Sequence, residues 1–227
     1  NAPLVTLYAF AILIFILNPP SALLLFAVSA FFGSFLPILI VLSMMKIGII
    51  PDFFASVRRT RTKPFIGVIT SYLMGLVALA LLQAPRSLVA LMACYIVNSL
   101  VMLAITQVWK ISIHASGVAG PVTFLIHQHG AYMLPFLALL LPVGWARIKL
   151  KAHSVRQVAA GALLTIILTL VQAELYYNRN DLECLVLSTR GRSQSNGQMQ
   201  WDPEGTHQII LEKTHTKTVP LQSGGIT

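Results

Sequence analysis

The sequence predicts an all-α fold, a polytopic transmembrane bundle of about six or seven spanning helices. First, 56% of the 227 residues are hydrophobic, only 10% are charged, and the mean hydropathy is +0.76. A soluble domain needs more polar surface than this composition supplies. Second, the apolar residues form long uncharged blocks separated by short charged segments. Third, the blocks lack the alternation of barrel strands, which leaves helices as the only spanning structure.

The uncharged blocks predict the helices in chain order. A spanning helix needs about 20 apolar residues, or fewer in a thin bilayer. The first four blocks predict one helix each and cover residues 2–17, 21–45, 64–85 and 87–109. Block 111–146 has no Lys, Arg, Asp or Glu over 36 residues, which is too long for one helix. Because Gly130 and Pro135 interrupt it, we expect two helices that meet near Gly130. Block 157–173 supplies the last helix.

Charge is distributed unevenly along the chain. Asp52 is the only carboxylate before Glu174. The basic clusters follow the second, fourth and sixth predicted helices and comprise Lys46, Arg58, Arg59, Arg61, Lys63, Lys110, Arg147, Lys149, Lys151 and Arg156. With seven helices these clusters emerge on one face, while the opposite face has only Arg86 ahead of the tail. The positive-inside rule favours a cytoplasmic location for the basic face, although cations that bind phosphate would count toward the same rule, so the face that carries the site stays open.

Two of these clusters also contain an imidazole, which the positive-inside rule does not explain. His114 follows Lys110 by four residues, and His153 follows Arg147 by six. Fixed cations neutralise phosphate oxygens, one imidazole can attack phosphorus, and another can protonate the leaving oxygen. Ser112 and nearby backbone N–H groups can add neutral hydrogen bonds. The pattern predicts a phosphate site at this end of the bundle.

Other chemistries find less support in the sequence. We expect no metal and no cofactor, because the chain offers neither a carboxylate pair for Mg²⁺ nor clustered Cys and His ligands for zinc. Cys94 and Cys184 are far apart and predict no disulfide framework. His127 and His129 are expected to pack or to line a helix junction. The expected partners are membrane lipids and a phosphorylated lipid, with no nucleic acid; the oligomeric state stays open.

Three segments resemble the signature motifs of the type 2 phosphatidic acid phosphatase superfamily. Family members carry Lys, six residues and Arg-Pro; then Pro-Ser-Gly-His; then Ser-Arg, five residues, His, three residues and Asp. This chain has "RRTRTKPF" at 58–65, "ISIHASG" at 111–117 and "ARIKLKAHSVRQ" at 146–157, in the same order. The resemblance covers about residues 1–175. It implies a helical core with a phosphate pocket at the membrane surface.

The resemblance also implies roles for individual residues. His153 would be the nucleophile that forms a phosphohistidine, and His114 would be the general acid for the leaving alkoxide. The residues that would hold the phosphate oxygens are Arg147, Lys63 and Ser112. Arg59, near Lys63, and Lys110, near Ser112, are further candidates.

The chain departs from the family motifs at several positions. Lys63 stands where the family has Arg, which keeps the charge but loses the bidentate fork. Ser56 stands where the first motif has Lys, so Arg58, Arg59 or Arg61 would substitute, and the spacing does not choose among them. The other replaced positions in the second and third motifs are Ile111, Ile113 and Ala146.

The replacement with the largest consequence is Gln157, which stands where the family has the Asp that orients the nucleophile. At i+4 from His153, its amide oxygen can accept the imidazole N–H and fix the tautomer. An amide does not stabilise the positive charge that develops on the ring. Two functions therefore stay open: hydrolysis through a phosphohistidine, and binding of a phosphorylated lipid without turnover. An unrelated transporter or structural bundle is a third.

Substrate class and domain organisation follow from where the charges lie. Basic loops at the ends of apolar helices place the site at headgroup depth, which favours a lipid phosphate or polyprenyl diphosphate over a soluble sugar phosphate. Protein cations would then do the work of a metal. We expect an integral, multi-pass membrane domain over residues 1–176. Residues 177–227 are polar and predict a tail without a fixed fold.

Overall fold

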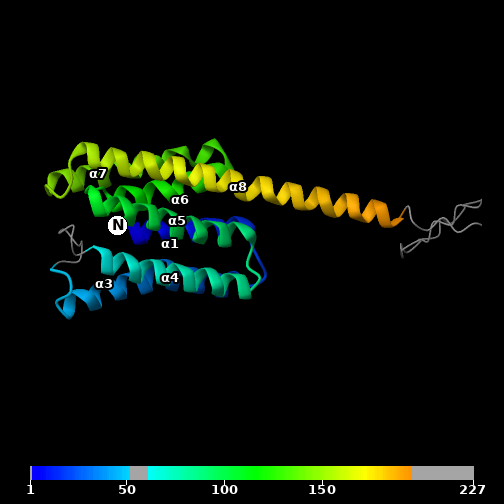
Figure 1. Cartoon of the computed structure of the whole chain (residues 1–227), viewed down its shortest axis with the longest axis horizontal. Coiled ribbons are helices and arrows are strands. Elements are labelled where there is room, and N and C mark those ends of the chain that lie inside the picture. The colour runs from blue at the N-terminus through cyan, green and yellow to red at the C-terminus, as the bar shows by residue number, and fades with distance from the viewer. Residues whose placement is uncertain (1, 52–60, 196–227) are drawn as a thin grey trace, which may run out of the picture. The chain divides into compact units, whose positions relative to one another are not determined.

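Every regular element in the described part of the chain is helical, which confirms the all-α class (Figure 1). The computed structural model describes residues 2–51 and 61–195, with side-chain surroundings for residues 3–51 and 61–176. The chain divides into two compact units, Asn1–Leu182 and Glu183–Thr227. The first unit is the helical bundle.

Within the described residues, seven helical segments run alternately in opposite directions (Figure 1). The second segment contains a π-helical stretch, η1 (Phe31–Phe35), and the sixth begins with a 3-10 helix, η3 (Ala131–Leu139). In order, the elements are α1 (Ala2–Leu17); α2 (Ala22–Ala30), η1 (Phe31–Phe35) and α3 (Leu36–Lys46); α4 (Thr62–Leu81); α5 (Arg86–Val108); α6 (Ile113–His129); η3 (Ala131–Leu139) and α7 (Leu140–Lys149); and α8 (Val155–Ser195).

Five of these segments are long and apolar enough to cross a membrane. They are Ala22–Lys46, Thr62–Leu81, Arg86–Val108, Ala131–Lys149 and Val155–Tyr176. The first helix is apolar but shorter, at Pro3–Leu17. Helix α6 has 17 residues and a run of buried residues at 118–125, and it packs against α1, α5, η3 and α7. As the central helix it faces protein rather than lipid, so small and polar residues are tolerated in it.

The uncharged block at 111–146 forms two helical segments that meet at Gly130, as predicted. Helix α6 ends at His129, and Gly130 adopts φ +91°, a conformation that favours glycine. The chain then reverses into η3. Pro135 does not cause the break, because it lies inside η3.

Hydrogen bonds between polar side chains hold α8 against α5 and α6. Ser116 Oγ and Thr165 Oγ1 lie 2.6 Å apart. Asn98 Nδ2 donates to Thr169 Oγ1 at 3.0 Å and Asn98 Oδ1 accepts from Gln172 Nε2 at 3.0 Å. Such bonds are a common way to join helices in an apolar environment, where burial alone does not drive them together. They fix α8 relative to the start of α6.

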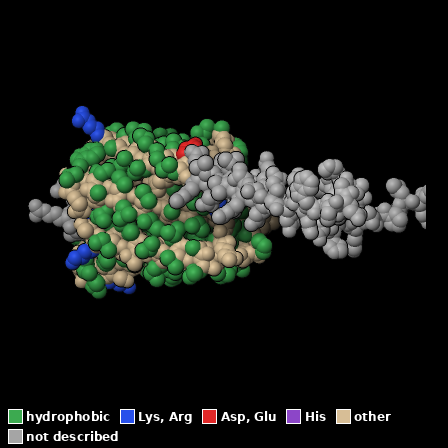
Figure 2. Space-filling model, turned by 45° about the vertical axis from the view of Figure 1, so that its right-hand side comes forward, with side chains coloured by type: hydrophobic (Ala, Val, Ile, Leu, Met, Phe, Trp, Pro, Cys, Tyr) green, Lys and Arg blue, Asp and Glu red, His purple; other side chains and the backbone are tan. Residues whose placement is uncertain are grey.

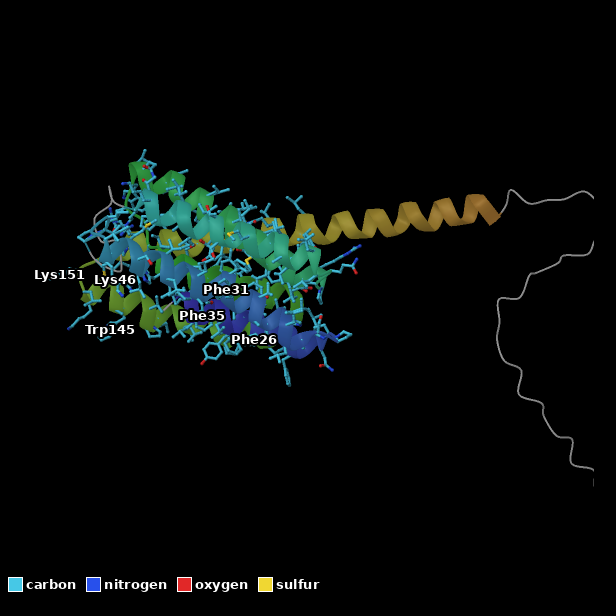
Figure 3. All side chains as sticks on the ribbon, turned by 90° about the horizontal axis from the view of Figure 1, so that it is seen from below. Phe26, Phe31, Phe35, Lys46, Trp145 and Lys151 are labelled. Atoms are coloured by element: carbon cyan, nitrogen blue, oxygen red, sulfur yellow. The ribbon has the colours of Figure 1, made fainter. Side chains whose placement is uncertain are left out.

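The helix ends that flank the three basic segments, at Lys46 and Thr62, Val108 and Ile113, and Lys149 and Val155, lie at one end of the bundle, as the helix count predicts (Figure 1). Lys46 and Lys151, from two of these segments, lie at the same end as Trp145 (Figure 3). On the face shown in Figure 2, hydrophobic side chains cover much of the flank between the ends of the bundle. Phe31 and Phe35 lie between the two ends (Figure 3) and are 45% and 54% exposed, as expected of side chains that contact lipid.

Helix α8 differs from the expectation for the tail. It continues past Tyr176 to Ser195, so the backbone of residues 177–195 is helical. The sequence expectation of no fixed fold relied on polar composition, and a helix can continue from an anchored segment into residues that would not nucleate one. The rest of the expected tail, residues 196–227, lies outside the described residues.

Candidate functional site

The basic end of the bundle places three helix N-termini together, each with a residue of the predicted motifs. Arg61 is the N-cap residue of α4, and Ser112 is the N-cap residue of α6. The Ser154 hydroxyl accepts from Gln157 N–H at 3.3 Å at the start of α8. Helix N-termini carry partial positive charge and unsatisfied N–H groups, which favour an anion.

Gln157 forms a reciprocal capping box with Ser154, and this arrangement assigns the tautomer of His153. Ser154 N–H donates to Gln157 Oε1 at 3.1 Å, while Gln157 N–H donates to Ser154 Oγ. His153 Nδ1 lies 3.3 Å from the same Oε1. Since an amide oxygen can only accept, Nδ1 carries the proton. The lone pair of the neutral ring is therefore on Nε2.

Arg147 is held next to His153 by the turn that joins α7 to α8. The Arg147 carbonyl accepts from Ala152 N–H at 3.0 Å and from His153 N–H at 3.2 Å. Lys151 adopts φ +51° in this turn, which lets the chain fold back. The Arg147 side chain is only 7% exposed, and His153 is 8% exposed. The turn thus holds Arg147 and His153 of the third motif next to each other.

Ile111 and Ser112 of the second motif form hydrogen bonds with both the first and the third motif. Arg61 Nη1 donates to the Ile111 carbonyl at 3.3 Å, and Ser112 N–H donates to the Gln157 carbonyl at 3.2 Å. A Cβ at Gly161 would lie 2.5 Å from the Ser112 carbonyl oxygen, so only glycine permits this approach of α8. Hydrogen bonds therefore connect all three motif segments.

Both histidines lie close enough to the cations of the other segments for those charges to shift their pKa values. Burial, followed by the charges of Arg147 and His153, lowers the pKa of His114 to about 3. Burial, followed by the charges of Arg61 and Lys110, lowers the pKa of His153 to about 4, although its bond to Gln157 opposes this. Both rings are neutral at pH 7. An anion among these groups would raise both pKa values.

The predicted phosphate-binding residues lie in different surroundings. Ser112 is fully buried, and its hydroxyl caps α6 by accepting from Ala115 N–H at 3.4 Å. Lys110 is partly exposed and close enough to His153 to influence its titration. Lys63 is exposed, in contrast to the buried residues Arg61, Arg147 and His153. Arg59 lies outside the described residues.

Among the described residues of the first motif, Arg61 is the cation that is buried with the other two motifs. It is 2% exposed, and its charge acts on both His114 and His153. Arg61 lies immediately before the first residue of α4, which places its side chain at the helix start, beside the other segments. Arg58 and Arg59, the other two candidates, lie outside the described residues.

A partly open cavity of about 190 Å³ lies between the helices beside the buried residues of the motifs. Side chains of α1, α3, α4, α5 and α6 line it, and Arg61 and His114 form part of its wall. Among the residues with described side chains, no group of three or more His, Cys, Asp or Glu comes together to hold a metal ion.

His127 and His129 lie at the opposite end of the bundle, next to the helix junction at Gly130. His127 Nε2 lies 3.1 Å from Glu174 Oε1. This location agrees with their interpretation as packing or junction residues and separates them from the basic cluster.

Comparison with known proteins adds no family assignment. No protein-family model, no curated protein and no solved structure matches the chain.

Proposed function

We propose that the protein is an integral, multi-pass membrane phosphatase that hydrolyses a lipid phosphate or polyprenyl diphosphate through a phosphohistidine at His153. The observation that carries this proposal is the convergence of two imidazoles and two guanidinium groups from three distant segments. Arg61 and Arg147 supply charge for the phosphate oxygens, with Lys110 at the rim. Buried guanidinium groups suit phosphate because their N–H donors match its oxygens.

The first chemical step uses His153 and His114 in different protonation states. The Nε2 lone pair of His153 attacks phosphorus, and the bond from phosphorus to the leaving oxygen breaks with its electron pair. This oxygen belongs to an alkoxide in a lipid phosphate and to a polyprenyl phosphate in a diphosphate, and it takes a proton from the His114 imidazolium. His114 is neutral in the free site, and the bound phosphate dianion supplies the negative charge that favours its protonated form.

The second step regenerates the site with water. Neutral His114 takes a proton from a water molecule, whose oxygen attacks phosphorus. The phosphorus–nitrogen bond breaks, its electron pair returns to His153 Nε2, and inorganic phosphate leaves. Protein groups perform each of these steps, so the proposed mechanism is metal-independent.

Binding of a phosphorylated lipid without turnover is the second candidate, and one observation favours it. The group that orients His153 is the neutral amide of Gln157, 3.3 Å from Nδ1. A carboxylate would stabilise the cationic ring of the phosphohistidine, whereas an amide only fixes its orientation.

Turnover of a substrate panel separates these candidates. The purified protein is assayed for inorganic phosphate release from phosphatidate, dodecyl phosphate and a polyprenyl diphosphate in detergent micelles. The proposal predicts release by the wild type, none by His153→Ala, and a labelled phosphohistidine trapped by rapid quenching. His127→Ala serves as the matched control at the other end. Saturable binding without release supports the second candidate; release that persists in His153→Ala contradicts the phosphohistidine route.

A further inference from the structure

The cavity beside the site extends from the basic end into the apolar interior. Arg61 and His114 line the cavity at the basic end of the bundle. Tyr72 of α4 and Leu91 and Cys94 of α5 line it farther from that end. Arg61 and Tyr72 are separated by three turns of helix, or about 16 Å at the usual rise per residue. The hydrocarbon core of a bilayer is about 30 Å thick. The cavity therefore spans about the depth of one leaflet.

The walls of the cavity are suited to a hydrocarbon chain. Ile38, Val68 and Met102 are typical of its lining, which is mostly apolar below Arg61 and His114. Tyr72 and Tyr95 pack together at the deep end, with ring centroids 5.3 Å apart. The cationic residue at one end and the apolar walls match an amphiphile with an anionic head and an apolar tail.

The volume of the cavity limits how many chains it can hold. At about 190 Å³ it is only slightly larger than the roughly 150 Å³ apolar cavity that accommodates one benzene molecule. Pockets for drug-sized ligands begin at about 300 Å³. Because the cavity is open along part of its surface, one slender chain can lie in it with part of the chain outside, whereas two chains side by side exceed its volume.

We infer that this cavity holds the single hydrocarbon chain of an amphiphile whose phosphate lies against Arg61 and His114. The substrate class is then a lipid phosphate with one chain. The second chain of a diacyl lipid would have to stay outside the bundle. This inference rests on the proposed function for the position of the phosphate, and it adds the position and number of the chains.

Photo-crosslinking tests the location of the chain without requiring turnover. The full-length protein in detergent micelles is irradiated with dodecyl phosphate that carries a diazirine at the end of its chain, and labelled residues are mapped by mass spectrometry. We expect labels on the deep lining residues Tyr72, Leu91 or Cys94. The corresponding diazirine-bearing dodecanol should label them at least about tenfold less, because it lacks the charge that Arg61 and His114 would hold. Labels confined to outward-facing residues would overturn the inference.

A pair of neighbouring substitutions on α5 provides the matched control. Ser99 lines the cavity, whereas Leu100 is 48% exposed on the flank. Ser99→Phe should fill the space and lower deep labelling at least about tenfold, and Leu100→Phe should leave it unchanged. If Ser99→Phe fails to fold, Val68→Phe narrows the cavity from α4, with Ile66→Phe as its exposed control. Deep labelling unaffected by either filled variant contradicts the inference.

The outcomes also separate this inference from the proposed function. His153-dependent hydrolysis without deep labelling, and with equal rates for dodecyl phosphate and phosphatidate, rejects the one-chain cavity alone. Deep labelling by the phosphate probe in a protein that releases no phosphate supports the cavity and rejects hydrolysis.

Discussion

The two ends of the bundle carry the same kinds of side chain in different surroundings. At one end His127 lies 3.1 Å from Glu174, and Tyr176 Oη donates to the Arg86 carbonyl at 3.0 Å. At the other end His114 and His153 experience the positive charges of arginines from two different segments. An imidazole beside a carboxylate forms an internal ion pair when protonated. Imidazoles among cations form an environment that an anion would stabilise.

This difference shows why residue type alone does not identify a site. Among residues with described side chains, Glu174 is the only carboxylate, and it lies at the end opposite the basic loops. Placing His127 beside it gives that histidine a local structural partner. The following predictions test whether the two ends differ in function as they differ in charge.

The largest expected effect is the loss of turnover on removal of the proposed nucleophile. His153→Ala should lower kcat by about a thousandfold or more, as loss of a covalent nucleophile does in known hydrolases. His127→Ala at the opposite end should change kcat less than threefold, because it contacts neither the substrate nor the cluster. Phosphate release under saturating substrate measures both. Comparable losses in the two variants would contradict a functional difference between the ends.

The next largest effect concerns the buried arginine. Arg61→Ala should reduce kcat/KM about 100- to 1000-fold, the usual cost of removing a preorganised group from developing charge. Arg86→Ala should have little effect, because Arg86 lies at the other end. Since Arg61 also donates to the Ile111 carbonyl, Arg61→Lys serves as the milder variant that keeps the charge. Its activity should fall between those of Arg61→Ala and the wild type. Activity of Arg61→Ala equal to that of Arg86→Ala would remove Arg61 from the site.

Gln157→Glu tests the orienting group with almost no change in shape. The glutamate keeps the reciprocal cap with Ser154 and adds a negative charge beside His153 Nδ1. It should raise the pKa of His153 by about 1 to 3 pH units and increase the rate of phosphohistidine formation. NMR titration of the ring and single-turnover kinetics measure these effects. An unchanged pKa would show that residue 157 does not contact the imidazole.

The smallest expected effect is on thermal stability in acid. The folded-state pKa of His153, about 4, and that of His114, about 3, lie below the unfolded value of 6.5. Between about pH 3 and 6.5 the unfolded chain therefore binds more protons, and the stability that these histidines contribute is lost as pH falls. The Tm should decrease over this window, and the decrease should be smaller in a His114→Asn/His153→Asn variant. An equal decrease in that variant would assign it to other groups.

The sequence was sufficient for the architecture because its evidence is local. Uncharged blocks of suitable length predict helices one by one, and Gly130 marks the one break inside a block. Alternation of helix direction then places the basic loops at one end. These conclusions required no knowledge of which helices pack together.

The arrangement of the site depended on contacts that no local pattern contains. Arg61 and Lys63 are two residues apart in a run of cations, and only the start of α4 separates the buried residue from the exposed one. The second role of Gln157, as half of a capping box, required Ser154 to be the N-cap residue of α8. The cavity is made by five elements, so its presence follows from tertiary packing.

Binding of orthovanadate tests most directly whether the basic end is an anion site. Vanadate can add a fifth ligand, such as an imidazole nitrogen, and so mimics phosphorus during the proposed attack by His153. Calorimetric titration should show saturable binding to the wild type, weakened at least about tenfold by His153→Ala or Arg61→Lys, and unchanged in His127→Ala and Arg86→Ala. Absence of saturable binding, or equal weakening by substitutions at both ends, would contradict an anion site at the basic end.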